Sequence, residues 1–529
     1  MRGPFPNLRE FRTAGGSFLT QEALGRPFPW HPLVLAAYPV LFLYAINADQ
    51  VPAGQVIVPL ALVVGLAALG MVGGVVAFRS PHRGALVTSG LILLVFSFGH
   101  LLDLIGAAWR TPLLVTWGLL ALGIGFLAGR LGRHLPRPTR FLNTAAVILV
   151  ATALATLVGA RGPALFAPAG ASPADTPAGP AAAGNPGRDI FYLVFDRYGG
   201  EAGLQERYGL DNRAFLDWLQ ERGFFVAGGS FANYPKTNHS LAASLNYTYL
   251  DRLTREAGSG SDDWRPVDRL LQDHAVGRFL QRRGYRYVHI GSWWGPTDVA
   301  EGADQSLNYD PRSEFATVLL QSTVVPSLLD AVGVETDLDD WEVHYRSALY
   351  QFDQLERLAR ARAGPPTFVF AHVLLPHPPY VFTREGEFVP KAERGTNFEQ
   401  QLTYTNRRIE ELVELLLGGP EEEDPVVIIQ GDEGPFPDRY AHDVERFDWR
   451  QATDQELLIK TNILNAYYLP GEADPDPYPT ITPVNSFRLV FDRYFGTELP
   501  LLEDRSYVFI DEQHLYDFID VTDRLRRGG

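Results

Sequence analysis

Apolar residues follow two different patterns in the two parts of this 529-residue chain. The first part carries long apolar runs separated only by short polar breaks, each run close to the roughly 20 residues that a helix needs to cross a bilayer. Helices buried in a soluble core do not follow one another in this way. The pattern predicts an N-terminal segment (1–30) and a five-helix transmembrane domain (31–160), with helices at about 31–48, 54–78, 85–108, 112–129 and 141–160.

Beyond residue 188, short apolar runs alternate with longer amphipathic ones. The apolar runs predict strands at 189–196, 224–231, 285–292, 367–375, 426–432 and 465–471. Helical periodicity lies between them at about 211–222, 265–283, 340–362 and 398–417. Strands that alternate with helices form a mostly parallel sheet covered on both faces. We therefore expect an α/β/α sandwich over 188–529.

Residues 161–187 join the two parts and are rich in proline, alanine and glycine without apolar periodicity. Such a composition buries too little apolar surface to fold, and it is typical of a semi-stiff linker. A structured loop on the α/β domain is the alternative interpretation.

The two parts also differ in charge. Residues 1–187 contain 12 arginines, no lysine and 5 acidic residues, whereas residues 188–529 carry a net charge of −23. If five helices are counted, ten of the twelve arginines fall on one side of the membrane, which is then cytoplasmic. These arginines are Arg2, Arg9, Arg12, Arg26, Arg79, Arg83, Arg130, Arg133, Arg137 and Arg140. The pattern predicts a multi-pass plasma (inner) membrane protein with a cytoplasmic N-terminus and an extracytoplasmic α/β domain.

Several classes of function and of site are excluded or disfavoured by composition. The chain has no cysteine, which excludes disulfides, thiolate metal sites and a cysteine nucleophile. The acidic α/β domain lacks the basic surface of a nucleic-acid-binding protein. The first thirty residues have no apolar core followed by small residues, so they do not resemble a cleavable signal peptide.

Two carboxylates mark the ends of predicted strands. Asp196 ends the apolar run DIFYLVFD, and Asp432 follows the run VVIIQG. The carboxyl ends of parallel strands are where α/β proteins place ligands and metals. Each aspartate alone could be a turn-forming or helix-capping residue. Together they predict one metal site assembled by the fold.

Thr237 opens a predicted helix directly after a strand, in the segment FANYPKTNHSLAASL. A threonine at this position usually caps the helix N-terminus. A hydroxyl at the positive end of a helix can also serve as a nucleophile when a metal ion is close. The two carboxylates favour the second interpretation.

Two histidines and two tryptophans lie beyond other predicted strands. His377 follows a strand in LLPHPPYVF, where flanking prolines stiffen the backbone and aim the imidazole at a phosphoryl oxygen or a proton. His372 falls within the strand and is interpreted as a packed core histidine. Trp293 and Trp294 could line a site, although ordinary packing is the favoured interpretation.

Several segments together resemble the sulfatase-like branch of the alkaline phosphatase superfamily: DIFYLVFDRYG, NYPKTNHSLAASLN, LLPHPPYVF, QGDEGP and YPTITPVNSFRLVFDRYFG. The helical anchor followed by an exterior domain resembles the lipoteichoic acid synthases and the lipid phosphoethanolamine transferases. The resemblance implies an alkaline-phosphatase-like sheet with Thr237 as nucleophile and metal ligand. It also implies Asp196 and Asp432 as metal ligands and His377 as a phosphate contact. Trp294 and Asn238 are further candidate substrate contacts, which the resemblance does not assign.

The chain departs from this family in two places. The Thr237-Asn238-His239-Ser240 segment cannot form the formylglycine of true sulfatases, which disfavours sulfate-ester hydrolysis. The family usually has Asp-His-Gly where this chain has Asp432-Glu433-Gly434. If Glu433 replaces the histidine as a ligand, Mn²⁺ or Mg²⁺ is favoured over Zn²⁺ as the divalent cofactor. A second metal ion would need further ligands, for which His442 is the nearby candidate.

The predicted function is that of a membrane-anchored, metal-dependent phosphotransferase or phosphodiesterase with a threonine nucleophile. It would act on phosphate esters of the cell envelope, with a membrane phospholipid as donor and a glycan or lipid as acceptor. One alternative is a catalytically inactive relative that serves as a binding or scaffold protein, as Glu433 suggests. Another is a transport protein whose exterior domain is regulatory, which the near absence of charge in the apolar runs disfavours.

Overall fold

The computed structural model forms two compact units. One comprises Met1–Ala167 with Phe315–Thr336, and the other comprises Pro168–Glu314 with Asp337–Gly529. The residues described are 27–48, 51, 53–132, 135–161, 187–309, 314–334, 340–361, 364–390, 396–471 and 474–528. Most of the predicted N-terminal segment (1–30) and of the predicted linker (161–187) therefore lies outside the described residues.

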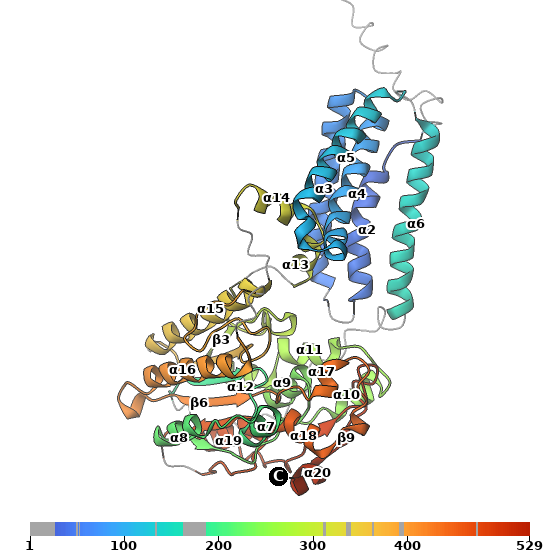
Figure 1. The fold of residues 1–529 in the computed structure, drawn as a ribbon. Coiled ribbons are helices and arrows are strands. Elements are labelled where there is room, and N and C mark those ends of the chain that lie inside the picture. Colours follow the sequence, from blue (N-terminus) through green and yellow to red (C-terminus); the bar gives the residue numbers. More distant parts are fainter. Residues whose placement is uncertain are drawn as a thin grey trace, which may run out of the picture. The chain divides into compact units, whose positions relative to one another are not determined.

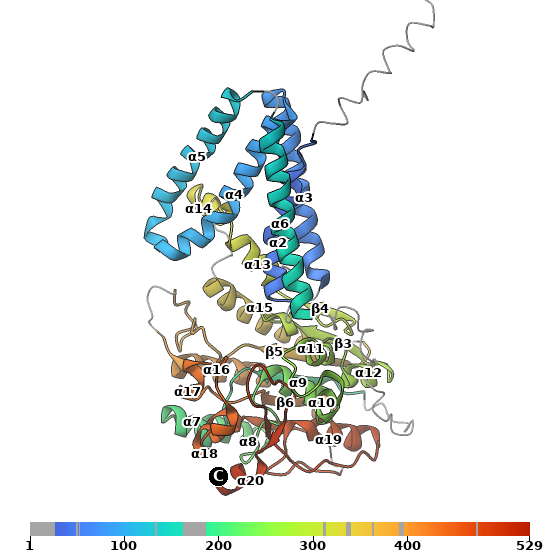
Figure 2. The same cartoon turned by 90° about the vertical axis from the view of Figure 1, so that its right-hand side faces the viewer.

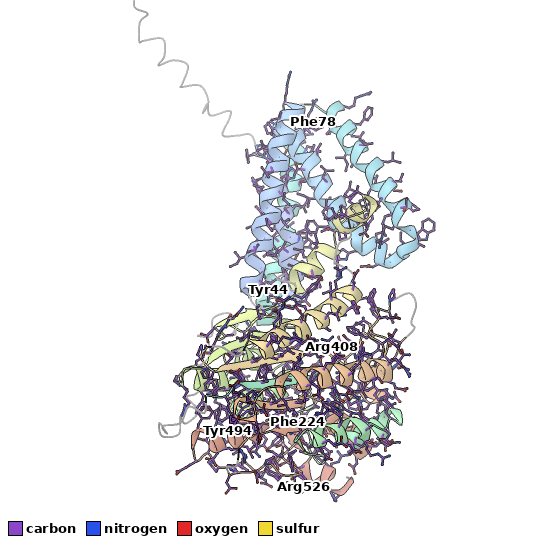
Figure 3. The ribbon with its side chains drawn as sticks, turned by 90° about the vertical axis from the view of Figure 1, so that its left-hand side faces the viewer. Tyr44, Phe78, Phe224, Arg408, Tyr494 and Arg526 are labelled. Carbon is purple, nitrogen blue, oxygen red and sulfur yellow. The ribbon has the colours of Figure 1, made fainter. Side chains whose placement is uncertain are left out.

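The first unit contains a bundle of five apolar helices, which accounts for every predicted span (Figure 1). They are α2 (His31–Ile46), α3 (Ala53–Phe78), α4 (Pro81–Ile105), α5 (Arg110–Arg130) and α6 (Pro136–Arg161). The last four are long and apolar enough to cross a membrane. Helix α2 is shorter, at 16 residues, or about 24 Å. Tyr44 and Phe78, near the carboxyl ends of α2 and α3, lie toward opposite ends of the bundle (Figure 3).

The second unit is built on a seven-stranded sheet in the order β2-β7-β6-β1-β5-β3-β4. Its pairs are parallel except where β7 joins β2 and β6. The six predicted strands are confirmed as β1 (Ile190–Phe195), β2 (Phe225–Val226), β3 (Arg286–Ile290), β5 (Thr367–Val373), β6 (Val426–Gly431) and β7 (Asn465–Tyr468). Sequence did not predict the short strand β4 (Gln305–Leu307) or the hairpin of β8 (Tyr507–Val508) and β9 (Ile519–Asp520).

Side chains of the central strand β1 alternate between two cores, as expected for a sheet buried on both faces. Tyr192 and Val194 enter one core, and Leu193 and Phe195 enter the other. The first core is covered by α9 (Thr237–Leu245), α11 (Arg265–Gln272), α12 (Ala275–Gln281) and α19 (Pro483–Phe495). The second is covered by α8 (Arg213–Glu221), α15 (Asp340–Arg360) and α16 (Phe398–Leu416). The predicted α/β/α sandwich is confirmed.

Shorter helices complete this unit, and sequence periodicity did not predict them. They are α7 (Glu201–Tyr208), α10 (Asp251–Ala257), α17 (Asp438–His442), α18 (Asp454–Thr461) and α20 (Thr522–Gly528). The single helix predicted over 265–283 is in fact two, α11 and α12. The break falls at His274, whose extended backbone and side chain cap the second helix.

His274 makes the stability of the fold depend on pH. Its Nδ1 accepts a hydrogen bond from the Gly277 amide at 3.0 Å, and its Nε2 lies 2.7 Å from the Tyr287 hydroxyl. Burial, together with the nearby His289, lowers its pKa to about 3. The unfolded chain, with a pKa near 6.5, binds the proton first as the pH falls. Each pH unit between about 6.5 and 3 should therefore cost about 1.4 kcal/mol of folding free energy at this residue.

The variant His274→Asn keeps a capping side chain but cannot take up a proton. We expect it to melt at a lower temperature at pH 7.5 and to show a shallower fall in Tm between pH 7.5 and pH 5. The exposed His442 supplies the matched control, because His442→Asn should leave the slope unchanged. Equal slopes for His274→Asn and the native protein would contradict this account.

Candidate metal centre and active site

The site forms at the carboxyl ends of three neighbouring strands. In the sheet, β1 lies between β5 and β6, and Phe195 pairs with both Val373 and Gly431. Asp196 and Asp432 are each the next residue beyond this paired level. Because side chains alternate along a strand, both face the same side of the sheet as Val194 and its partner on β5, His372. Register alone therefore places two carboxylates and an imidazole together.

Three buried donor atoms converge at this point. Asp196, His372 and Asp432 each offer one ligand atom, and these atoms all lie within 4.8 Å of one another. Asp196 Oδ1, His372 Nε2 and Asp432 Oδ2 are buried and make no hydrogen bond of ordinary geometry within the described part of the chain. The other oxygen of Asp432 is held by the backbone amides of Arg197 and Glu433, at 3.0 and 2.7 Å.

His372 has a second role that the sequence did not reveal. It is a buried, hydrogen-bonded strand residue, as predicted, but only its Nδ1 is engaged, 2.8 Å from Thr297 Oγ1. In the tautomer that carries its proton on Nδ1, His372 donates to Thr297, and Nε2 keeps a lone pair for the group of carboxylates. Metal-bound histidines are oriented in this way by a partner on the other ring nitrogen. His372 therefore belongs with the candidate ligands.

The electrostatics of this group fit a divalent cation. Burial, followed by the neighbouring Asp432 carboxylate, raises the pKa of Asp196 well above its usual range. Burial also raises the pKa of Asp432. Two carboxylates so close together are stable as anions only when a cation lies between them. Two carboxylate oxygens and one imidazole nitrogen suit Mn²⁺ or Zn²⁺.

Thr237 is the first residue of α9, as predicted, but it does not cap that helix. Lys236 occupies the N-cap position, and no side chain there bonds the helix amides. Instead, the side chain of Thr237 lies close enough to the Asp432 carboxyl to lower its pKa. One turn later, Ser240 Oγ donates to the Asp432 carbonyl at 2.6 Å and fastens α9 to the end of β6. The hydroxyl of Thr237 is thus held at the carboxylate group.

His377 also lies at this group, on the loop after β5. Its Nδ1 donates to the Pro378 carbonyl, and its Nε2 lies 3.9 Å from Asp196 Oδ2. Burial and then the Arg197 guanidinium keep its pKa well below the usual range, so the ring is neutral at pH 7. In this tautomer Nε2 has a lone pair and lies near Asp196. A cation or a proton could therefore be shared between His377 and Asp196.

Glu433 follows Asp432 in the chain, but its carboxylate forms ion pairs with basic side chains of the protein. Its Oε1 is 2.5 Å from the Lys460 ammonium and 3.5 Å from Arg197 Nε. Lys460, on α18, is fully buried. Burial raises the pKa of Glu433 and lowers that of Lys460 to about 8, and the ion pair opposes both shifts. One oxygen of Glu433 is therefore committed to a cation that the protein supplies itself.

The remaining predicted site residues lie near these groups with other contacts. Trp294 packs edge-on against His372 with ring centres 5.8 Å apart, and Trp293 packs against His377 at 6.0 Å. The amide of Asn238 points to Asp268, at 2.5 Å. The second-metal candidate His442 is exposed on α17 and is not one of the three convergent donors.

A cavity of about 320 Å³ adjoins the site. Arg197 and Pro378, the neighbours of Asp196 and His377, line it together with the aromatic rings of Tyr208, Tyr380 and Phe436. Arg197 lies over the Phe436 ring at 3.4 Å, and Arg207 also lines the cavity. The cavity thus offers aromatic faces and the guanidinium of Arg197, and its wall also contains Arg207, which is paired with Asp438 at 2.6 Å.

His372 and Lys460 are the two residues that sequence reasoning missed. His372 and Asp196 lie on the same face of the sheet because β5 pairs with β1 so that His372 is opposite Val194. No sequence pattern predicts this register. Lys460 had a weak signal: it is one of only three lysines in the chain, and it interrupts the apolar run LLIKTNIL.

Comparison with known proteins shows the family. Residues 189–470, slightly more than half of the chain, match the family model described as Sulfatase. No curated protein sequence matches the chain significantly.

Three solved structures illustrate the similarity. The periplasmic domain of EptC from Escherichia coli, in complex with Zn, is 11% identical with a TM-score of 0.42, covering 65% of this chain and 95% of that one. The lipoteichoic acid synthase LtaP from Listeria monocytogenes is 15% identical with a TM-score of 0.35, covering 61% and 77%. The integral membrane protein lipooligosaccharide phosphoethanolamine transferase A (EptA) from Neisseria meningitidis is 14% identical with a TM-score of 0.37, covering 87% and 94%.

The family model covers the strands β1, β5 and β6 and the residues Asp196, Thr237, His377 and Asp432. These are the positions on which the sequence resemblance was based. The chain therefore belongs to the sulfatase family.

Proposed function

We propose that this protein is a membrane-anchored, metal-dependent phosphotransferase or phosphodiesterase that acts on phosphate esters of envelope lipids or glycans. The observation that carries the proposal is the convergence of ligand atoms of Asp196, His372 and Asp432 within 4.8 Å, with the side chain of Thr237 beside the Asp432 carboxyl. A nucleophile, a metal-binding group and an anchor in the membrane are then parts of one chain.

The metal would be held by Asp196, Asp432 and His372, with Thr237 beside it. When bound, a divalent ion neutralises the charge of a phosphoryl group and lowers the pKa of a neighbouring hydroxyl. The sequence favoured Mn²⁺ or Mg²⁺ because Glu433 stood in place of a histidine. The contact of Glu433 with Lys460 and the donor nitrogen of His372 change this expectation, so that Mn²⁺ and Zn²⁺ both remain compatible.

In the proposed first step, Thr237 gives its proton to the Asp432 carboxylate and its Oγ attacks phosphorus. The P–O bond to the lipid breaks, and the leaving alkoxide takes that proton from Asp432, so that a phosphothreonine and a free lipid alcohol form. In the second step, His377 Nε2 accepts the proton of an acceptor hydroxyl, whose oxygen attacks phosphorus. The bond from phosphorus to Thr237 Oγ breaks, and the proton held by His377 returns to Thr237 Oγ. Water as acceptor gives hydrolysis, and a glycan or lipid hydroxyl gives transfer.

The adjoining cavity suits the head group or the acceptor. Arg197 and Arg207 can bind an anionic oxygen, and Tyr208 and Tyr380 offer aromatic faces for a sugar or glycerol unit. The orientation inferred from the arginines places this unit outside the cytoplasm, where a lipid donor of the outer leaflet presents its head group.

An inactive relative is the second candidate, and the Glu433–Lys460 pair favours it. A fixed internal cation beside the carboxylates reduces the need for a metal ion. Incubation of the full-length protein with Mn²⁺ or Zn²⁺ and a soluble aryl phosphodiester decides between the two. Turnover that a chelator abolishes supports the enzyme, whereas no turnover with any common divalent ion supports the inactive relative.

Metal content gives a separate prediction. We expect Asp196→Asn and His372→Phe to lose at least about tenfold in metal affinity, because each removes one of few ligands. Glu433→Gln should retain the metal, since its oxygen is held by Lys460. Metal stoichiometry of the purified variants, measured by mass spectrometry, checks all three. Loss of metal only in Glu433→Gln would reverse the assignment and restore Glu433 as the ligand.

A further inference from the structure

One segment belongs to the helical unit although its neighbours in sequence belong to the α/β unit. It follows β4, precedes α15 and consists of α13 (Glu314–Gln321), a short turn and α14 (Val325–Ala331). From Phe315 onward, its contacts assign it to the unit of α2 to α6. Figure 2 shows α13 and α14 among the helices of that unit. We call residues 315–334 the insertion.

The insertion docks on α4 through backbone atoms. The Gly99 amide donates to the Ser322 carbonyl at 3.1 Å, and the Val324 amide donates to the Val95 carbonyl at 3.0 Å. Gly99 and Val95 lie one turn apart on α4, which is continuous from Pro81 to Ile105, so both contacts fall at the same level of that helix. A Cβ atom at Gly99 would lie 2.5 Å from the Gln321 carbonyl oxygen, so this approach requires a glycine.

Several polar groups of the insertion bond within the protein. In its turn, Ser322 and Thr323 donate their hydroxyls to the carbonyls of Leu319 and Leu320, at 2.7 and 2.6 Å. The only charged residue of the insertion, Asp330, pairs with Arg110 at 2.9 Å. Non-helical backbone is tolerated at membrane depth only where its hydrogen bonds are made within the protein.

Apart from Asp330, which pairs with Arg110, the large exposed side chains of the insertion are apolar. Five are exposed: Val318, Val325, Leu328, Val332 and Val334. Val332 is 73% exposed, comparable with the 66% of Leu66 on the apolar helix α3. Such a patch is unusual on a surface that faces water.

The level along α4 at which the insertion docks also indicates that the insertion lies within the lipid bilayer. Gly99 lies six residues, or about 9 Å, before the end of α4 at Ile105. An element bonded to α4 at that level lies beside a span long and apolar enough to cross a membrane.

We propose that the insertion is a re-entrant element embedded in the lipid on the side of the membrane where α4 ends. Its exposed valines and leucine contact acyl chains. The α/β unit is then anchored by this element as well as by the predicted linker. The inference holds whether or not the protein is an enzyme.

The absence of native cysteines makes the test direct. Single cysteines replace Leu328 or Val332 in the full-length protein, and an environment-sensitive fluorophore is attached in phosphatidylcholine vesicles. Leu66→Cys on α3 provides the lipid-facing control and Leu501→Cys in the α/β unit the water-facing one. We expect spin-labelled lipid to quench Leu328→Cys and Val332→Cys several-fold more than aqueous iodide does, as for Leu66→Cys. Stronger quenching by iodide would show that these positions face water and would overturn the proposal. Protection from both quenchers would show that another protein surface, such as a second copy of the chain, covers them, and would overturn it as well.

A glycine pair tests the docking contact itself. Gly99→Leu should displace the insertion from α4, so that the fluorophore at Leu328→Cys is quenched more by iodide and less by spin-labelled lipid. Gly118→Leu should not, because a Cβ atom at Gly118 on α5 has no neighbour within 4 Å. Unchanged quenching in Gly99→Leu would show that α4 does not hold the insertion.

Discussion

Replacement of Thr237 by valine is expected to abolish phosphoryl transfer, with a loss on the order of 10³-fold or more in kcat. Valine keeps the shape of the side chain and the start of α9 but has no oxygen to attack phosphorus. Turnover of an aryl phosphodiester by full-length protein in vesicles measures the loss. Mass spectrometry of the native protein, quenched during turnover, should show a phosphate on Thr237 that Thr237→Val lacks.

Two further variants separate chemistry from folding. Thr237→Ser retains a hydroxyl and should keep part of the activity. Thr403→Val removes a hydroxyl from the exposed face of α16, where it bonds only the Glu399 carbonyl, and should keep all of it. Full activity in Thr237→Val would exclude the proposed nucleophile. A loss of activity without any phosphothreonine would instead indicate direct attack by water.

Local sequence patterns predicted the sheet and half of the site because both depend on short-range order. The run Ile190–Phe195 is apolar at every position, the run Val426–Gly431 is apolar except at Gln430, and both are buried throughout, as for strands covered on both faces. Polar residues follow where these strands leave the core. The position of Thr237 followed from the same logic, since a helix begins directly after the turn. Parallel pairing then brought Asp196 and Asp432 to one edge.

Contacts between distant segments were beyond such reasoning. His372 became a candidate ligand only through its register with Val194, and Lys460 reaches Glu433 from α18. The insertion contains two helices of seven and eight residues, too short for a clear period, and its place beside α4 depends on the absence of a side chain at Gly99. The presence of Glu433 could be read from the sequence, but its partner could not.

Replacement of Lys460, the partner of Glu433, is expected to have the largest effect on stability. In Lys460→Met the ammonium is lost while the aliphatic volume is kept, so that Glu433 remains buried with only Arg197, at 3.5 Å, to balance it. Removing one member of a buried ion pair costs about 3–5 kcal/mol, because the remaining charge has neither water nor a partner. We expect a loss of this size in the free energy of unfolding by urea, followed at pH 7 by tryptophan fluorescence.

The double variant Glu433→Gln/Lys460→Met tests the cause. With both charges removed, most of the lost stability should return, and the deviation of the double variant from additivity measures the coupling. The exposed pair of Arg222 and Glu414 provides the control, since Arg222→Met should cost less than about 1 kcal/mol. If Lys460→Met costs no more than this control, the pair is not ionised in the folded protein. Glu433 is then free to bind a metal ion, as the sequence had suggested.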